Sequence, residues 1–270
     1  MAAFLDQIVA ATRRRVEQAK RSADARALEC RAAEHKPRGF RRALECASRE
    51  RIAVIAELKK ASPSKGLIRA DFDVTRLASE LETAGASALS VLTDEEFFQG
   101  SLENLRRASA ATQLPCLRKD FILDEFQLLE ARAFCADAVL LIVAALSQAK
   151  LIALVRRAGE HELDVLCEAH DEHELQCALD AGCDLIGVNT RDLRTFQVDL
   201  QAASRLAHRF PRNVVRVAES GIHSAADVER LRTAGYHAVL IGESLMRANS
   251  PGQALRELLA SAELRVPTGE

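Results

Sequence analysis

The sequence predicts an α/β protein, a (β/α)8 TIM barrel with an N-terminal helical extension. Apolar runs of strand length alternate eight times with segments of helical periodicity from residue 52 onward. Three helix-to-strand junctions also share one pattern, in which an Ala-Gly pair ends a helix shortly before the next strand. Eight strand–helix units in roughly 220 residues fit one closed barrel of parallel strands.

Each unit can be placed along the chain. The expected strands are Ala53–Leu58, Ala88–Leu92, Cys116–Arg118, Ala138–Val143, Val165–Cys167, Leu185–Val188, Val214–Ala218 and Ala238–Ile241. The expected helices are Val74–Ala84, Leu102–Ala111, Glu125–Cys135, Ser147–Ala158, Asp171–Ala181, Leu200–His208, Ala225–Ala234 and Pro251–Leu259. Gly85, Gly182 and Gly235 supply left-handed helix caps at the repeated junctions. The alternative is a doubly wound open sheet. Such a sheet would normally carry a Gly-rich first turn, but neither G-x-G-x-x-G nor G-x-x-x-x-G-K-[ST] occurs in the sequence.

Residues 1–47 precede the alternating pattern and form the predicted extension, whereas residues 48–270 form the barrel, within a single domain overall. Phe4, Leu5, Ile8 and Val9 recur at helical spacing, and Val16 continues the same face. A second helix is expected at residues 24–34 and a third short piece at 40–46. We expect this extension to pack on the barrel and cover one of its ends.

Composition limits the partners. The net charge of −2 and the pI of about 6.4 give no global basic field, which argues against nucleic acid or an anionic membrane as partner. Neither a signal peptide nor an apolar run of membrane-spanning length is present. The seven cysteines include no C-x-x-C pair, which is typical of reduced core thiols in a cytoplasmic protein.

Charged and polar residues collect where the predicted strands end, which is where barrels of this kind place their active sites. The first strand ends in Glu57 and Lys59, two residues that share one face. A polar loop, which we expect to be mobile, follows at residues 62–66. The other strand ends carry Thr93, Asp94, Arg118, Lys119, Asp120, Glu168, Asn189, Glu219 and Glu243. Such a concentration of glutamates and lysines at one barrel mouth would be costly without a function.

The last two strands indicate a phosphate site. Small residues follow them at Ser220, Gly221 and Gly242, where backbone amides can approach an anion. The Glu243 carboxylate would repel phosphate, so we expect its side chain to point away and only its amide to contribute. Ser62 could close over the same phosphate from the first strand.

Metal binding is the weaker interpretation of the remaining polar residues. His170 and His173 could join Glu168 as ligands, but they lie at the start of the predicted helix 171–181. We therefore expect no metal.

The strand-end blocks resemble the indole-3-glycerol-phosphate synthase family of tryptophan biosynthesis. Residues 57–66 (ELKKASPSKG) are similar to the family's signature. Further blocks follow in the same order, at residues 98–101 (FQGS), 117–121 (LRKDF), 187–193 (GVNTRDL), 218–221 (AESG) and 241–246 (IGESLM). The resemblance covers residues 54–246, and the helical extension also fits it.

The resemblance implies a carboxy-lyase that acts on 1-(2-carboxyphenylamino)-1-deoxyribulose 5-phosphate, a small phosphorylated molecule. Ring closure with loss of carbon dioxide and water gives indole-3-glycerol phosphate. By position, Lys119 is implied as the general acid, with its pKa tuned toward neutrality by burial and neighbouring cations. Lys59 would face the leaving carboxylate, and Glu168 would serve as the second acid–base group.

The resemblance also implies roles for the other blocks. Glu57, Asn189 and Glu219 would hold the lysines and the substrate hydroxyls. Ser62, Arg191, Ser220, Gly221, Gly242 and Glu243 would bind phosphate. Phe98 and Phe121 would wall the aromatic ring. No cofactor is implied, because the aryl amine activates its own ring carbon. The sequence gives no indication of contact with other tryptophan-pathway enzymes.

Two alternatives are weighed against this lyase. A related phosphosugar isomerase should use a Cys/Asp acid–base pair at the strand ends, but Lys and Glu stand there. A non-catalytic binding barrel would be expected to have lost the charged residues at its strand ends, but these residues are present. The loop at 62–66 is further expected to couple phosphate binding to placement of Lys59, since one segment would then touch both ends of the substrate.

Overall fold

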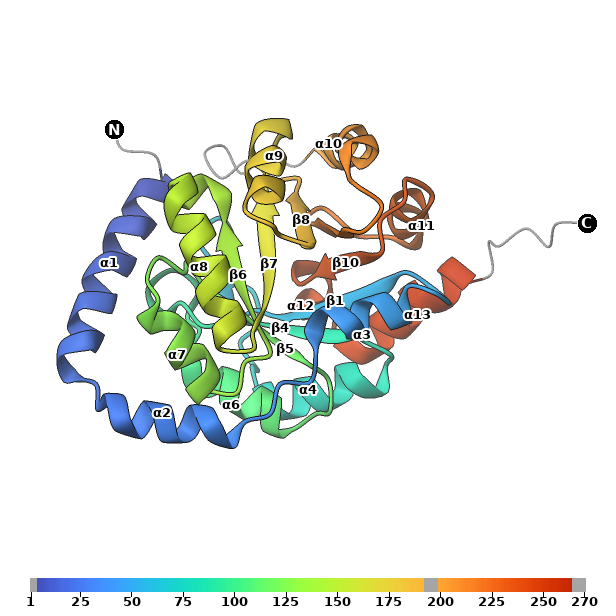
Figure 1. Ribbon diagram of the computed structural model, residues 1–270. Coiled ribbons are helices and arrows are strands. Elements are labelled where there is room, and N and C mark those ends of the chain that lie inside the picture. The colour runs from blue at the N-terminus through green and yellow to red at the C-terminus, as the bar shows by residue number, and fades with distance from the viewer. Residues whose placement is uncertain (1–3, 192–198, 264–270) are drawn as a thin grey trace, which may run out of the picture.

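A computed structural model describes residues 4–191 and 199–263; Asp192 and Leu193 of the resemblance block lie outside the described residues. Eight parallel strands close into a barrel, in which each strand pairs with its neighbours along the chain and the last pairs with the first (Figure 1). The barrel strands are β1 (Ala53–Leu58), β4 (Ala88–Leu92), β5 (Cys116–Lys119), β6 (Ala138–Ile142), β7 (Asp164–Ala169), β8 (Leu185–Asn189), β9 (Val215–Glu219) and β10 (Ala238–Ile241). The predicted TIM-barrel fold is confirmed.

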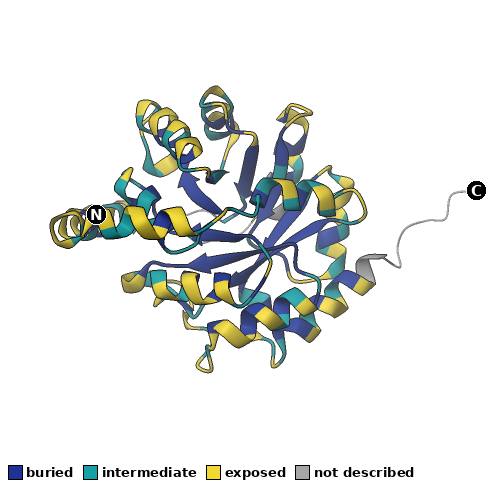
Figure 2. Cartoon of the chain, turned by 60° about the horizontal axis from the view of Figure 1, so that its bottom comes forward, coloured by how far each residue is buried: buried dark blue, intermediate teal, exposed yellow. Residues whose placement is uncertain are grey.

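Helices surround the barrel with their exposed faces outward, while the barrel strands are buried (Figure 2). They are α4 (Val74–Thr83), α6 (Leu102–Ala110), α7 (Phe126–Ala133), α8 (Gln148–Glu160), α9 (Glu172–Asp180), α10 (Leu200–Leu206), α11 (Ala225–Thr233) and α13 (Pro251–Glu263). Gly85, Gly182 and Gly235 have φ of 97°, 81° and 92°, the left-handed conformation that ends a helix. The repeated Ala-Gly junctions therefore have the expected structure.

Several short elements differ from the prediction. Residues 62–66 do not form a wholly irregular loop, because β2 (Ala61–Ser62) and β3 (Gly66–Leu67) pair antiparallel as a small hairpin. Val143 lies in the 3-10 turn η1 (Val143–Ala145) rather than in β6. The structure adds α5 (Glu95–Phe98), α12 (Glu243–Arg247) and the 3-10 turn η2 (Ala207–Arg209). Elements this short have too few residues for a periodic pattern.

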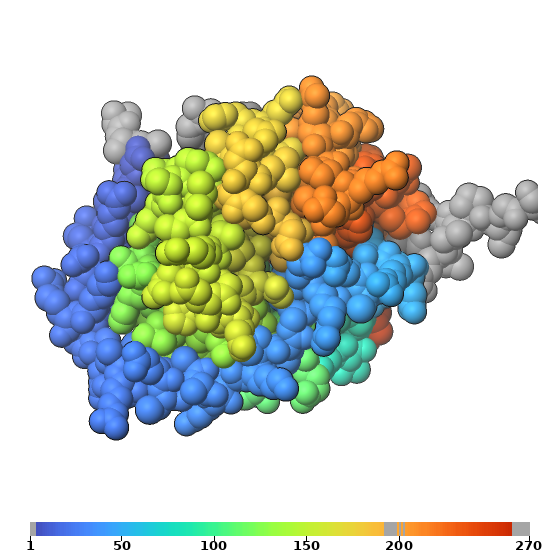
Figure 3. Space-filling model, in the orientation of Figure 1, coloured from blue at the N-terminus to red at the C-terminus, as the bar shows by residue number. Residues whose placement is uncertain are grey.

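The N-terminal segment forms α1 (Phe4–Ser22), α2 (Ala25–Glu34) and α3 (Phe40–Ala47). In Figure 3 this segment, in blue, runs down one side of the molecule and along its base. Phe40 and Leu44 of α3 are 0% exposed and pack against residues inside the barrel, including Ala53 and Ala88 at the beginnings of their strands. The third helix thus fills the end of the barrel opposite the predicted site.

Two apolar clusters hold the fold together. The larger lies between strands and surrounding helices, and the smaller fills the barrel interior from α3 up to Ile8 and Phe121. None of the described helices combines the length and the apolarity that crossing a membrane requires.

Candidate active site

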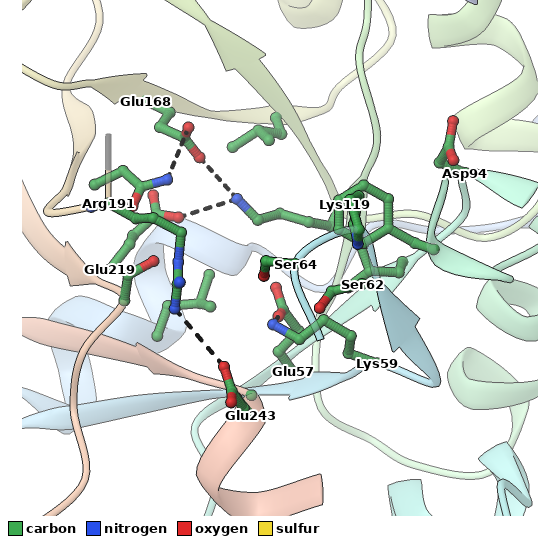
Figure 4. Close-up of a pocket in the computed structure, with 18 of the residues that line it drawn as sticks. Glu57, Lys59, Ser62, Ser64, Asp94, Lys119, Glu168, Arg191, Glu219 and Glu243 are labelled. Atoms are coloured by element: carbon green, nitrogen blue, oxygen red, sulfur yellow. Dashed lines mark hydrogen bonds and ion pairs between the residues drawn. The ribbon is translucent and has the colours of Figure 1, made fainter. Parts of the chain in front are cut away.

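The carboxyl ends of the barrel strands surround a cavity of about 1200 Å³, open solvent at its mouth included (Figure 4). Every site residue predicted from the sequence lines this cavity. They are Glu57, Lys59, Ser62, Phe98, Lys119, Phe121, Glu168, Asn189, Arg191, Glu219, Ser220, Gly221, Gly242 and Glu243. The parallel strands place residues that are far apart in the sequence around one volume.

Lys119 is the last residue of β5 and lies in the part of the cavity where the reaction is expected to take place. Its Nζ donates to Glu168 Oε2 at 2.8 Å and to Glu219 Oε2 at 3.0 Å. The Lys119 side chain is 14% exposed and both carboxylates are 2% exposed. Burial alone would lower the pKa of Lys119, but Glu168, Glu219 and Glu57 raise it above its ordinary value. The expectation of a pKa tuned toward neutrality is therefore wrong for this site, because the neighbouring charges are anions and not cations.

The two carboxylates beside Lys119 differ in their surroundings. Burial raises the pKa of Glu219 to about 7, against the opposing effect of Lys119 and with the support of Glu168. Burial also disfavours the charge on Glu168, but Lys119, His170 and the Asn189 amide hold its pKa below the ordinary value. Asn189 Nδ2 donates to Glu168 Oε1 at 3.1 Å. Glu168 is therefore the ionised member and Glu219 the more readily protonated one.

Glycines make room for two of these carboxylates. A Cβ on Gly187 of β8 would lie 2.0 Å from Glu219 Oε1. A Cβ on Gly242 would lie 2.5 Å from Glu57 Oε1. Gly242, predicted to expose its amide to phosphate, thus has a second reason to lack a side chain.

Lys59 and Glu57 form a second ion pair at the end of β1 and just beyond it. Lys59 Nζ donates to Glu57 Oε1 at 2.7 Å, and their side chains are 18% and 5% exposed. Ser90 Oγ of β4 donates to Glu57 Oε2 at 3.4 Å. The ammonium group of Lys59 is thereby held at the cavity wall by a buried carboxylate.

The predicted phosphate end combines positive charge with backbone amides. Ser220 and Gly221 adopt φ of 68° and 74°, and Thr190 Oγ1 donates to the Ser220 carbonyl at 3.1 Å. A non-glycine residue in this left-handed region is strained, and such strain concentrates at functional sites. Arg191 Nη2 lies 3.7 Å from Glu243 Oε2 (Figure 4). The Glu243 side chain therefore faces Arg191 instead of pointing away from the site.

The apolar wall of the cavity includes side chains that were not predicted from the sequence to line it. The Phe98 and Phe121 rings lie 6.5 Å apart between centroids. Phe4, Leu5 and Ile8 of α1 also line the cavity. Their amphipathic spacing predicted a buried helix face but gave no indication of what that face covers.

A hydrogen-bonded network of charged and polar side chains holds the residue that follows Lys119 in the chain. Asp120, the next residue, accepts from Arg15 Nη2 at 2.8 Å, from Thr93 Oγ1 at 2.7 Å and from Arg118 Nη2 at 3.0 Å. Arg15 also donates to Asp94 at 3.1 Å. Helix α1 is therefore fastened beside two of the strand ends that form the site.

His170, considered from the sequence only as a metal ligand beside Glu168, lies close to that carboxylate. Its Nε2 lies 3.5 Å from Glu168 Oε1. No cluster of side chains suited to holding a metal ion occurs in the part of the chain that the structure describes.

Solved structures resemble the fold at low sequence identity. A 3-hexulose-6-phosphate synthase gives a TM-score of 0.63 at 14% identity and covers 78% of this chain and 99% of its own. A thiamine phosphate pyrophosphorylase from Pyrococcus furiosus gives 0.60 at 16% identity, over 79% of this chain and 96% of its own. These likenesses concern the barrel alone.

Sequence relatives are much closer. An indole-3-glycerol phosphate synthase of Koribacter versatilis is 61% identical over 259 residues, which is 96% of this chain and 100% of the relative. A protein of the same name from Desulfotalea psychrophila is 48% identical over 96% of this chain and 99% of its own. The family model described as "Indole-3-glycerol phosphate synthase" matches residues 5–258. Matched almost from end to end, with its strand-end lysines and glutamates around one cavity, the chain belongs to the indole-3-glycerol phosphate synthase family.

Proposed function

We propose that the protein converts 1-(2-carboxyphenylamino)-1-deoxyribulose 5-phosphate to indole-3-glycerol phosphate, carbon dioxide and water. The observation that carries this proposal is Lys119, a partly buried cation held between the buried carboxylates of Glu168 and Glu219 at the barrel mouth. An ammonium group beside two carboxylates can give a proton to a substrate oxygen and has acceptors nearby for proton return.

Ring closure is assigned to Lys119. The ring carbon that bears the carboxylate attacks the ketose carbonyl carbon, and the carbonyl oxygen takes a proton from Lys119 Nζ. The raised pKa of Lys119 supplies a charged donor throughout the neutral range. The carboxylate then leaves as carbon dioxide, and its bonding pair returns to the ring. Lys59, fixed by Glu57, is placed to orient that carboxylate before it leaves.

Dehydration is assigned to the carboxylate pair. The new hydroxyl leaves as water once Lys119, protonated again, gives its oxygen a second proton, while a base removes a proton from the neighbouring CH2 carbon of the new ring to form the double bond. Glu168, held ionised, suits the base, and Asn189 fixes its second oxygen. Glu219, which is more readily protonated, suits the return of a proton to Lys119.

The opposite end of the cavity is assigned to phosphate. Ser62 on the hairpin, Ser220, Gly221, Gly242 and the Glu243 amide would bind this group, and these residues all line the same cavity as Lys119. Arg191 would exchange its contact with Glu243 for the phosphate, since a doubly charged anion attracts a guanidinium more strongly than one carboxylate does. Phe98 and Phe121 would flank the aryl ring at the other end.

Replacing Lys119 with Ala tests the proposal. We expect indole formation, followed by ultraviolet absorbance, to fall at least 1000-fold, about the effect of removing both a general acid and a charge. Carbon dioxide release from the same substrate should stop in parallel. The matched control is Lys150→Ala, which removes a lysine from the outer helix α8 and should leave both signals unchanged. Turnover retained by a folded Lys119→Ala protein would contradict the acid role.

A further inference from the structure

His170 is a partly buried histidine with one ring nitrogen close to the candidate base. It follows β7 directly, two residues after Glu168, and its side chain is 16% exposed. Nε2 lies 3.5 Å from Glu168 Oε1, and within the described part of the chain this buried nitrogen has no hydrogen-bond partner. The other oxygen of Glu168 is taken by Lys119.

Glu174 of α9 fixes the other side of the ring. Its Oε2 accepts from the His170 backbone N–H at 2.8 Å and lies 2.9 Å from His170 Nδ1. A carboxylate oxygen can only accept here, so Nδ1 carries a proton. The Glu174 side chain is 18% exposed, which keeps this contact largely away from water.

The protonation of Nδ1 determines what Nε2 presents to Glu168. A neutral ring would direct a lone pair at a carboxylate oxygen, which is repulsive, whereas an imidazolium ring directs an N–H there. Burial alone would lower the pKa of His170, but Glu174, Glu168 and Glu219 raise it. These three carboxylates come from α9, β7 and β9. The carboxylates on both sides of the ring therefore favour its protonated form.

We propose that His170, held by Glu174, is a positioning residue that fixes the carboxylate of Glu168 and keeps it ionised until it accepts a proton in the dehydration step. This inference rests on the proposed function, in which Glu168 accepts a proton after Lys119 has given one away. Once Lys119 is neutral, Glu168 loses the cation at its Oε2. His170 then remains beside Oε1 and prevents Glu168 from binding a proton too early.

The pH dependence of kcat separates this role from a merely structural one. Replacing His170 with Asn retains an amide donor near the Nδ1 position and removes the cation that faces Glu168. We expect the acid limb of the kcat profile to move upward by about one to three pH units, because an adjacent opposite charge depresses a carboxyl pKa by that amount. KM for the substrate should change little, since His170 does not line the cavity. Glu174→Gln should move the limb in the same direction by a smaller amount.

The control is His173→Asn on helix α9, which replaces an exposed histidine and should leave the profile unchanged. A uniform fall in kcat for His170→Asn, with the acid limb unmoved, would overturn the proposal and indicate only a structural contribution.

A second measurement does not depend on turnover. Imidazole ¹⁵N shifts of the intact protein, labelled at its seven histidines, give the pKa of His170 directly. Linkage requires that Glu168→Gln lower this pKa, as should Glu174→Gln. An unchanged His170 pKa in both variants would overturn the proposal. If the coupling is present but the wild-type protein releases no carbon dioxide from the substrate, the proposed function fails and the coupling of His170 to Glu168 stands.

Discussion

At the scale of single residues, Gly187 decides where Glu219 can lie. Replacing Gly187 with Ala would put a methyl group 2.0 Å from Glu219 Oε1. The carboxylate can rotate away more cheaply than the strand can move, so we expect it to leave Lys119. Turnover should then fall by at least tenfold, while the free energy of unfolding falls by about 1–3 kcal/mol, the usual cost of overpacking.

Gly159→Ala is the matched control for this substitution. No atom lies within 4 Å of a Cβ at Gly159, which is in helix α8. Alanine there should raise the free energy of unfolding by about 0.5–1 kcal/mol and leave turnover unchanged. Equal turnover in the Gly187→Ala and wild-type proteins would show that the position of Glu219 is unimportant.

The sequence predicted which residues meet at the site but not how they interact. Strand ends on a closed barrel must converge, so Lys119, Glu168 and Glu219 could be grouped from their positions alone. The direction of the Lys119 pKa depends on which side chains lie within hydrogen-bonding distance, and the sequence holds no such distances. His170 was considered beside Glu168 only as a metal ligand, since the sequence does not show that Glu174 and Glu168 lie on opposite sides of its ring.

At the scale of elements, the link between α2 and α3 is clamped to the barrel by Asp137. This buried carboxylate accepts from His35 Nε2 at 3.1 Å, from the Arg38 N–H at 2.7 Å and from the Cys116 N–H at 2.6 Å. Burial alone would lower the pKa of His35, but Asp137 and the neighbouring Cys135 raise it to about 9. The N-terminal extension is therefore attached partly through His35, whose charge depends on pH.

This clamp predicts a loss of stability in mild alkali. The folded protein holds the His35 proton up to about pH 9, whereas the unfolded chain releases it near pH 6.5. The stabilisation is thus complete below pH 6.5 and disappears as the pH rises to 9. We expect the free energy of unfolding in urea to fall by about 1–2 kcal/mol over that range. His35→Gln should flatten this slope, and a wild-type slope that persists in that variant would exclude His35 as its source.

Elements were predictable in proportion to their length. The barrel strands and their flanking helices were recognised because apolar periodicity persists over each segment, with only their ends shifted, as in Val165–Cys167, which becomes Asp164–Ala169. The hairpin of β2 and β3 was not, because two-residue strands show no alternation. Its pairing also shows that Ser62 starts from a bonded position, not from an open loop.

At the scale of the whole molecule, one apolar column connects the extension to the site. Phe40 and Leu44 enter the barrel from its base, strand residues such as Leu117 fill the middle, and Phe121 lies at the catalytic mouth. The sequence predicted that the extension covers an end of the barrel, but complementary surfaces decide which one. We propose that residues 1–47 and 48–270 unfold as one cooperative unit.

Replacing Phe40 with Ala tests this unity. The Phe40 side chain is 0% exposed, so its loss should lower the free energy of unfolding by about 3–5 kcal/mol.

Tyr236 is the sole tyrosine of a chain without tryptophan. It is 3% exposed, and its hydroxyl donates to the Ala203 carbonyl at 2.8 Å. Its fluorescence therefore reports on the barrel, while far-ultraviolet circular dichroism reports on all helices. If the chain is one unit, Phe40→Ala lowers the urea midpoint equally by both signals, and Ile152→Ala, at a side chain that is 46% exposed, moves neither. A Tyr236 transition that stays in place while the helical signal separates into two steps would show that the extension unfolds independently.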